Sequence, residues 1–360
     1  MKKLLKTTAV ALTMGFAATA AQAGELTIVS WGGGYTKSQI EAYHKPYIAL
    51  HGTKINSEDY SGGLAEVRAQ VEAGNVTWDL VDVELSDAVL GCDEGLFETI
   101  DPAILPAAPD GTPASEDFID GSVHECAVGS IVWSTIYAYD KTKFTGNAPT
   151  TLSDFFDVKG FPGKRGMRKA AKSNLEMALM ADGVAPADVY ATLSTPAGVD
   201  RAFAKLDTIK GDVLWWEAGA QPPQMLADGE VAMSTAYNGR VFGAIVSEKK
   251  PFEIVWDGQV YDLDLWVVPK DAPNKEEAMK FIAFSTDTQR LADQSKYISY
   301  GPVRKSSSAM IGQHAETGVD MLPHMPTAPD NFKNALGNDF QWWADYGDEM
   351  NERFASWLAQ

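Results

Sequence analysis

Aromatic side chains at the ends of the expected strands are the residues best suited to chemistry, and that chemistry is binding. The chain holds ten Trp and twelve Tyr residues. Those at expected strand ends are Trp31, Trp133, Tyr237, Trp256, Trp266 and Tyr300. Such rings attract organic cations and stack on methylene chains, at about 0.5–2 kcal/mol each. Core packing is the competing explanation for any one of them, so the pattern predicts a site without fixing its members.

Catalytic and metal-binding patterns do not occur in the sequence. There is no Gly-x-Ser-x-Gly or His-Glu-x-x-His motif, and the five histidines show no zinc spacing. Asp262 and Asp264 share a strand face, as any i, i+2 pair does. We therefore expect a protein that is not an enzyme and needs no metal or cofactor.

The glycines of Gly32–Ser38 superficially resemble a phosphate-binding loop. A true loop of this kind needs glycine directly before Lys-Ser, where this chain has Thr36. We expect the glycines to let the backbone turn tightly and approach a ligand instead.

The first 23 residues have the pattern of an export signal. Lys2, Lys3 and Lys6 precede an apolar run, and Ala21-Gln22-Ala23 provides a small-x-small cleavage site. The run is too short to span a bilayer, and no cysteine follows the cut to carry a lipid. We expect a soluble mature protein in the periplasm, beginning near Gly24.

Charge and cysteine content agree with export. The net charge of −19 becomes −22 once the three signal lysines are removed. Such acidity repels nucleic acid and anionic membranes and favours cationic small molecules, although it also serves solubility alone. The isolated pair Cys92 and Cys126 predicts a disulfide in an oxidising compartment.

Strands and helices alternate along the chain, which predicts mostly parallel sheets with helices on both faces. The expected strands cover 26–30, 54–57, 78–83, 130–139, 231–237 and 261–268. The expected helices cover 36–50, 64–73, 87–90, 151–156, 173–182, 196–209, 275–285 and the tail from Phe340. Residues 163–166 are expected to form a turn.

The mature chain is too long for one ordinary core, so we expect two lobes. Long strands near 133–139 and 260–266 would cross between them. Lobe 1 would comprise residues 24–134 and 262–325, and lobe 2 residues 135–261 and 326–360 with the C-terminal helices. A ligand would sit between the lobes, at the C-terminal ends of strands.

Several motifs, taken in order, resemble those of the periplasmic spermidine/putrescine-binding proteins, a branch of the solute-binding proteins of bacterial ABC importers. They are Trp31-Gly-Gly-Gly-Tyr35, Trp78-Asp-Leu-Val-Asp-Val83, Gly95-Leu-Phe-Glu-Thr-Ile-Asp101, Met233-Ser-Thr-Ala-Tyr-Asn-Gly239, Asp264-Leu-Trp-Val-Val-Pro269 and Tyr300-Gly-Pro302. The resemblance implies a two-lobed α/β fold of the type II periplasmic-binding class. It also implies a monomer that presents its ligand to an inner-membrane ABC permease.

The resemblance also implies a set of ligand-binding residues. Asp264 matches a carboxylate that pairs with a ligand amine, and Tyr237 stands where the family often has a stacking Trp. The other positions expected at the ligand are Trp31, Tyr35, Glu84, Ser86, Trp133, Arg240 and Tyr300.

The chain departs from the polyamine binders in ways that alter the expected ligand. Where those proteins carry acidic residues for the far amine, this chain has the basic segment Lys164–Lys172. Arg240 follows Asn238-Gly239, and arginine binds carboxylates in bidentate fashion. Asp264 with Arg240 would suit a zwitterion such as 4-aminobutyrate better than a long polyamine.

Other ligand classes also fit the sequence. Ferric-ion, thiamine and quaternary-amine binders would use the same fold. Iron binders need neighbouring tyrosines, and Tyr297 and Tyr300, three positions apart, do not have that arrangement. A periplasmic hydrolase on a similar scaffold is the remaining alternative.

Overall fold

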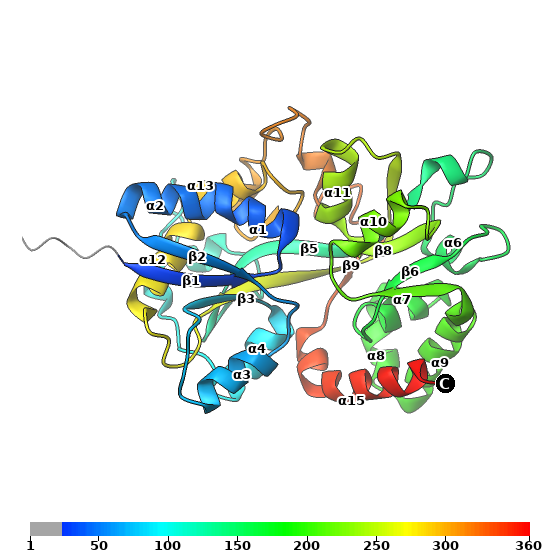
Figure 1. Cartoon of the computed structure of the whole chain (residues 1–360), viewed down its shortest axis with the longest axis horizontal. Helices are drawn as coiled ribbons and strands as arrows, with labels where there is room; N and C mark the ends of the chain where they lie inside the picture. Colours follow the sequence, from blue (N-terminus) through cyan, green and yellow to red (C-terminus); the bar gives the residue numbers. More distant parts are fainter. Residues whose placement is uncertain (1–23) are drawn as a thin grey trace, which may run out of the picture.

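A computed structural model describes residues 24–360 (Figure 1). The expected export signal lies outside these residues. The strands form one sheet in the order β2-β1-β3-β9-β5-β8-β6-β7. Within residues 24–360, no helix has the length and apolar character needed to cross a membrane.

Two groups of three parallel strands form the ends of this sheet. The first group is β1 (Glu25–Ser30), β2 (Lys54–Asp59) and β3 (Leu80–Glu84). The second is β6 (Arg165–Arg168), β7 (Val213–Trp216) and β8 (Met233–Tyr237). Parallel strands need crossover connections, and the expected helices supply them.

Two long antiparallel strands join the groups. They are β5 (Ala127–Asp140) and β9 (Phe252–Val267), and they run across the middle of the molecule in Figure 1. β9 pairs with β3, and β5 pairs with β8. Both strands are longer than the sequence indicates. The short strands β4 (Val123–His124) and β10 (Gly301–Pro302) pair with β5, and β11 (Leu336–Gly337) pairs with β9.

Helices surround both groups of strands. Those next to the first are α1 (Gly33–Gln39), a π-helical turn (Ile40–His44), α2 (Lys45–His51), α3 (Ala65–Glu72), α4 (Leu85–Asp93), α5 (Ala114–Asp117), α12 (Lys275–Ser285), α13 (Thr288–Gln294) and α14 (Lys305–Ser308). Those next to the second are α6 (Leu152–Phe156), α7 (Asn174–Ala181), α8 (Val189–Leu193), α9 (Pro196–Asp207), α10 (Gln221–Ala227), α11 (Asn238–Val246) and α15 (Phe340–Leu358).

Apolar side chains gather in two large cores. The first core takes its buried residues from Leu26–Val132 and Leu263–Val303. The second core takes them from Tyr137–Val260 and, through β11 and α15, from Leu336–Trp357. The crossing strands contribute to both, so they connect two separately packed bodies.

The turn expected at 163–166 is wrong, because β6 begins at Arg165. The Arg165 side chain is buried, and its guanidinium donates to the main-chain oxygens of Phe155, Gly163 and Phe161 at 2.6–2.7 Å. Glycine and basic residues are typical of turns in a sequence. Here carbonyl groups of the fold satisfy the charged group inside the second core.

The expected disulfide is confirmed. Cys92 in α4 and Cys126 just before β5 are bonded, with Cα atoms 5.8 Å apart and a separation of 34 positions in the sequence. The bond ties the end of α4 to the start of a crossing strand.

Replacing both cysteines by serine should lower the free energy of unfolding by about 3–4 kcal/mol, because the unfolded chain loses a constraint on a long loop. Denaturant unfolding measures the change. A reducing agent should shift the midpoint of the wild-type protein but not that of the C92S/C126S variant. Equal midpoints for the two proteins without reductant would contradict the prediction.

Candidate functional site

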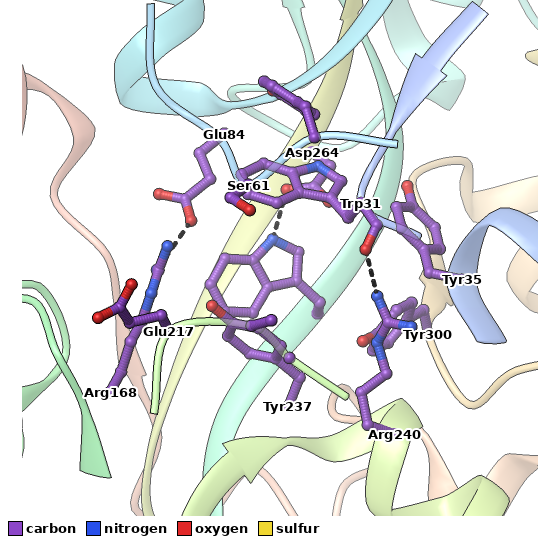
Figure 2. Close-up of a pocket in the computed structure, with 14 residues that line it drawn as sticks. Trp31, Tyr35, Ser61, Glu84, Arg168, Glu217, Tyr237, Arg240, Asp264 and Tyr300 are labelled. Carbon is purple, nitrogen blue, oxygen red and sulfur yellow. Dashed lines mark hydrogen bonds and ion pairs between the residues drawn. The ribbon is translucent and has the colours of Figure 1, made fainter. Parts of the chain in front are cut away.

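A cavity lies where the two groups of strands face each other across β5 and β9 (Figure 2). Eight of the nine expected ligand-binding residues line it: Trp31, Tyr35, Glu84, Trp133, Tyr237, Arg240, Asp264 and Tyr300. The ninth, Ser86, lines an adjoining cavity. The lining also includes residues that the sequence did not single out: Tyr60, Ser61, Arg168, Glu217, Ala218 and Gly219.

Strand ends explain why residues so far apart in sequence meet here. Trp31 follows β1, and Glu84 is the last residue of β3. On the other side Arg168 ends β6, Glu217 follows β7 and Tyr237 ends β8. The carboxyl ends of parallel strands in each group share one edge, and this is where α/β proteins bind ligands.

Aromatic rings form much of the cavity wall. The rings of Trp133 and Tyr237 meet edge to face with centroids 5.0 Å apart, and Tyr35 and Tyr300 do so at 5.4 Å. The ring of Trp31 packs on that of Tyr60 at 5.1 Å. These walls can stack on a short carbon chain.

Two of the aromatics noted in the sequence belong to cores instead. Trp266 is fully buried in the first core and packs against Phe281. Trp256 packs on an apolar cluster under α11. For these two residues, core packing is the correct explanation.

Asp264 presents a buried carboxylate to the cavity. Its Oδ1 atom accepts a hydrogen bond of 2.7 Å from the Trp133 indole. Burial raises the pKa of Asp264 well above its ordinary value, and the nearby acidic groups of Asp82, Glu84 and Asp262 raise it further. A ligand ammonium placed here would supply the missing positive charge.

Glu84 lies opposite Asp264 in the pairing of β3 with β9, but its surroundings are basic. Lys172 Nζ lies 2.8 Å from Glu84 Oε2, and Arg168 Nη1 lies 3.4 Å from Oε1. Although burial opposes it, the charges of Lys172 and Arg168 lower the pKa of Glu84 to about 2. Glu84 is thus ionised and already paired.

Arg168 and Lys172 are the members of the basic segment that reach the cavities. Lys164 and Lys169 form exposed ion pairs with Asp212 and Glu217. Beyond its long contact with Glu84, the Arg168 guanidinium lies 5.8 Å from the centre of the Tyr237 ring. Most of its donors are therefore available to a ligand.

Arg240 lines the cavity but also holds the first loop. Its Nη1 and Nη2 atoms donate to the main-chain oxygens of Gly32 at 2.6 Å and Trp31 at 3.0 Å (Figure 2). A Cβ on Gly33 would lie 2.7 Å from Nη1, and this residue has a φ of +56°. The glycines of this loop thus allow the Arg240 side chain to approach the backbone closely. The sequence had suggested that a ligand would approach there.

A metal centre is not visible in the part of the chain that the structure describes. Among residues 24–360, no three His, Cys, Asp or Glu side chains are arranged to hold a metal ion. Tyr300 lines the main cavity, whereas Tyr297 lines a different one.

Comparison with known families identifies the kind of protein. Residues 42–327 match the model of a family described as bacterial extracellular solute-binding protein. The chain belongs to this family. The expected resemblance is confirmed, and so is the two-lobed α/β fold. Solute-binding proteins are transporter components rather than enzymes, they bind small molecules outside the cytoplasm, and they work with ABC permeases.

Alignments with individual relatives span nearly the whole length of this chain. The chain is 46% identical to the gamma-aminobutyric acid-binding protein of Pseudomonas aeruginosa, over 96% of this chain and 95% of that one. A structure of the PBP MotA from A. tumefaciens B6 in complex with glucopine is 30% identical, with a TM-score of 0.84 over 93% of this chain and 99% of that one. The structure of the Atu4243-GABA receptor is 31% identical, with a TM-score of 0.79 over 94% and 98%.

Proposed function

We propose that this solute-binding protein captures a small zwitterionic ω-amino acid such as 4-aminobutyrate in the periplasm. It closes on the ligand as a monomer and presents it to an inner-membrane ABC permease. Asp264 holds the ammonium group, the aromatic walls hold the carbon chain, and Arg168 holds the carboxylate. Arg240 ties the first loop across the cleft.

The charge balance of the cavity is the observation that carries this proposal. Its lining offers the carboxylates of Glu84, Glu217 and Asp264 against the guanidinium groups of Arg168 and Arg240. Because Glu84 is also paired with Lys172, the site as a whole is close to neutral. This contrasts with the strongly acidic chain, whose net charge is −19. A neutral site with separated charges suits a zwitterion and disfavours a polycation.

The positions of the charges also suit a short ligand. In Figure 2, Arg168 and Arg240 lie on opposite sides of the cavity, and Asp264 lies between them. The names of two relatives point the same way, since one is a gamma-aminobutyric acid-binding protein and another a GABA receptor.

The lobe boundaries stay a prediction, with residues 24–134 and 262–325 in one lobe and 135–261 and 326–360 in the other. The division of the two cores supports it. Met321 and Met325 also pack on Phe242 and Val246 of α11, so the segment before the last boundary contacts the second lobe as well.

Calorimetry of the wild-type protein against a ligand panel tests the function. 4-Aminobutyrate should bind, and putrescine and spermidine should bind roughly tenfold or more weakly, because they bring a second ammonium beside basic groups. Thiamine, choline and ferric ion complete the panel. Tight binding of a polyamine would overturn the proposal, and so would the absence of binding to every ω-amino acid tested.

A further inference from the structure

We propose that Lys172 is a built-in ammonium that occupies the second amine position of the cleft and thereby excludes diamines. This inference rests on the proposed function and names the residue that sets its selectivity. The loop before α7 carries Lys172, and its side chain is buried among acidic groups.

The contacts of Lys172 are those of a complete ammonium site. Its Nζ atom lies 2.8 Å from Glu84 Oε2, 2.8 Å from Asp262 Oδ2 and 3.0 Å from Ser86 Oγ. An ammonium group has three hydrogens to donate. Glu84 and Ser86 accept hydrogen bonds from this one, and Asp262 lies at ion-pair distance. Both carboxylates are buried, so the group that fills this position must be positively charged.

The site lies at a diamine's distance from the proposed amine position. Asp262 and Asp264 are two residues apart on β9 and share one face, about 7 Å from each other. Glu84 is the register partner of Asp264 on β3. An extended diamine with one ammonium at Asp264 would place its other ammonium near Glu84 and Asp262, where Lys172 already lies.

The main cavity and the adjoining one meet at shared residues, so a ligand in the main cavity could reach the space that a shortened Lys172 would leave. Trp31, Glu84 and Arg168 line both the main cavity and the adjoining one, which Lys172 and Ser86 also line. Shortening Lys172 would therefore open a continuous path from Asp264 to the carboxylates of Glu84 and Asp262. Glu84 would keep only its long contact with Arg168, and Asp262 would have no cation among the described residues.

The test is a gain of function in K172A. Calorimetry with putrescine, cadaverine and 1,6-diaminohexane should show affinity increased roughly tenfold or more over the wild type for the best-fitting length, since a charge repulsion becomes an attraction. K172M is the matched control, because it removes the charge but keeps the space filled, and it should show no gain. A folded K172A that binds no diamine better than the wild type overturns the inference.

A second readout covers the case in which K172A folds poorly. Propylamine supplies the fragment that the substitution removes, so it should raise the unfolding temperature of K172A but not that of K172M or the wild type. If K172A is unfolded when purified, refolding with propylamine should recover it, and failure to recover it would overturn the inference. Wild-type binding of 4-aminobutyrate is measured separately, so a failure of the proposed function is recognised independently.

Discussion

Replacing Asp264 by asparagine should weaken binding of 4-aminobutyrate by about 2–5 kcal/mol, because a desolvated ammonium loses its counter-charge. Asparagine keeps the size of the side chain and an oxygen that can accept from the Trp133 indole, so the aromatic wall should stay in place. Calorimetry at constant pH measures the loss. Unchanged affinity would remove Asp264 from the site.

A matched control lies in the same cavity. Glu217 also lines it, but this exposed side chain is paired with Lys169 at 2.9 Å. E217Q should change affinity little, since an exposed pair in high dielectric contributes at most about 1 kcal/mol. Equal losses for D264N and E217Q would indicate a general field effect of acidic charge rather than an ammonium held at Asp264.

Asp264 should also make binding depend on pH. Its pKa is raised by burial and by neighbouring acidic groups, so the unliganded site keeps a proton there to a higher pH than a free carboxylate does. An ammonium ligand favours the ionised form, and binding therefore releases a proton. Affinity should rise with pH up to the raised pKa and level off above it. Calorimetry in buffers of different ionisation enthalpy measures the released protons, and D264N should release fewer.

The sequence predicted the parts of the site that depend on strand ends. Trp31, Glu84 and Tyr237 follow or end apolar strands whose pattern is visible along the chain, and a parallel arrangement brings such ends together. Asp264 was found through the motif that carries the family resemblance. Local pattern and topology suffice for these residues.

The residues that were missed depend on tertiary contacts. Arg168 ends β6, a strand that looks like a turn until the burial of Arg165 against main-chain carbonyls is known. Lys172 was noted only as part of a basic run, because its carboxylate partners lie far away in sequence. Trp266, noted only as an aromatic at a strand end, packs in a core, since a ring at such an end faces a core as readily as a cleft.

Replacing Arg168 by methionine should weaken binding of 4-aminobutyrate by about 2–4 kcal/mol, because an arginine–carboxylate pair in a closed cavity is lost. Methionine keeps a long unbranched apolar side chain and removes only the guanidinium, which lies 5.8 Å from the centre of the Tyr237 ring. The same variant should bind butylamine, which has no carboxylate, nearly as well as the wild type does. The difference between the two ligands isolates the contact between Arg168 and the carboxylate.

R240M is the comparison that decides which arginine holds the carboxylate. Two nitrogens of Arg240 already donate to the carbonyls of Gly32 and Trp31, which lie across the cleft from α11. Loss of the Arg240 guanidinium should therefore weaken binding of 4-aminobutyrate and of butylamine by similar factors, because the closed form becomes less stable. R240M could instead weaken binding of 4-aminobutyrate only, while R168M weakens binding of both ligands equally. In that case the ligand lies in the opposite direction, with its carboxylate toward the first loop. Asp264, which lies between the two arginines in Figure 2, would still hold the amine in that orientation.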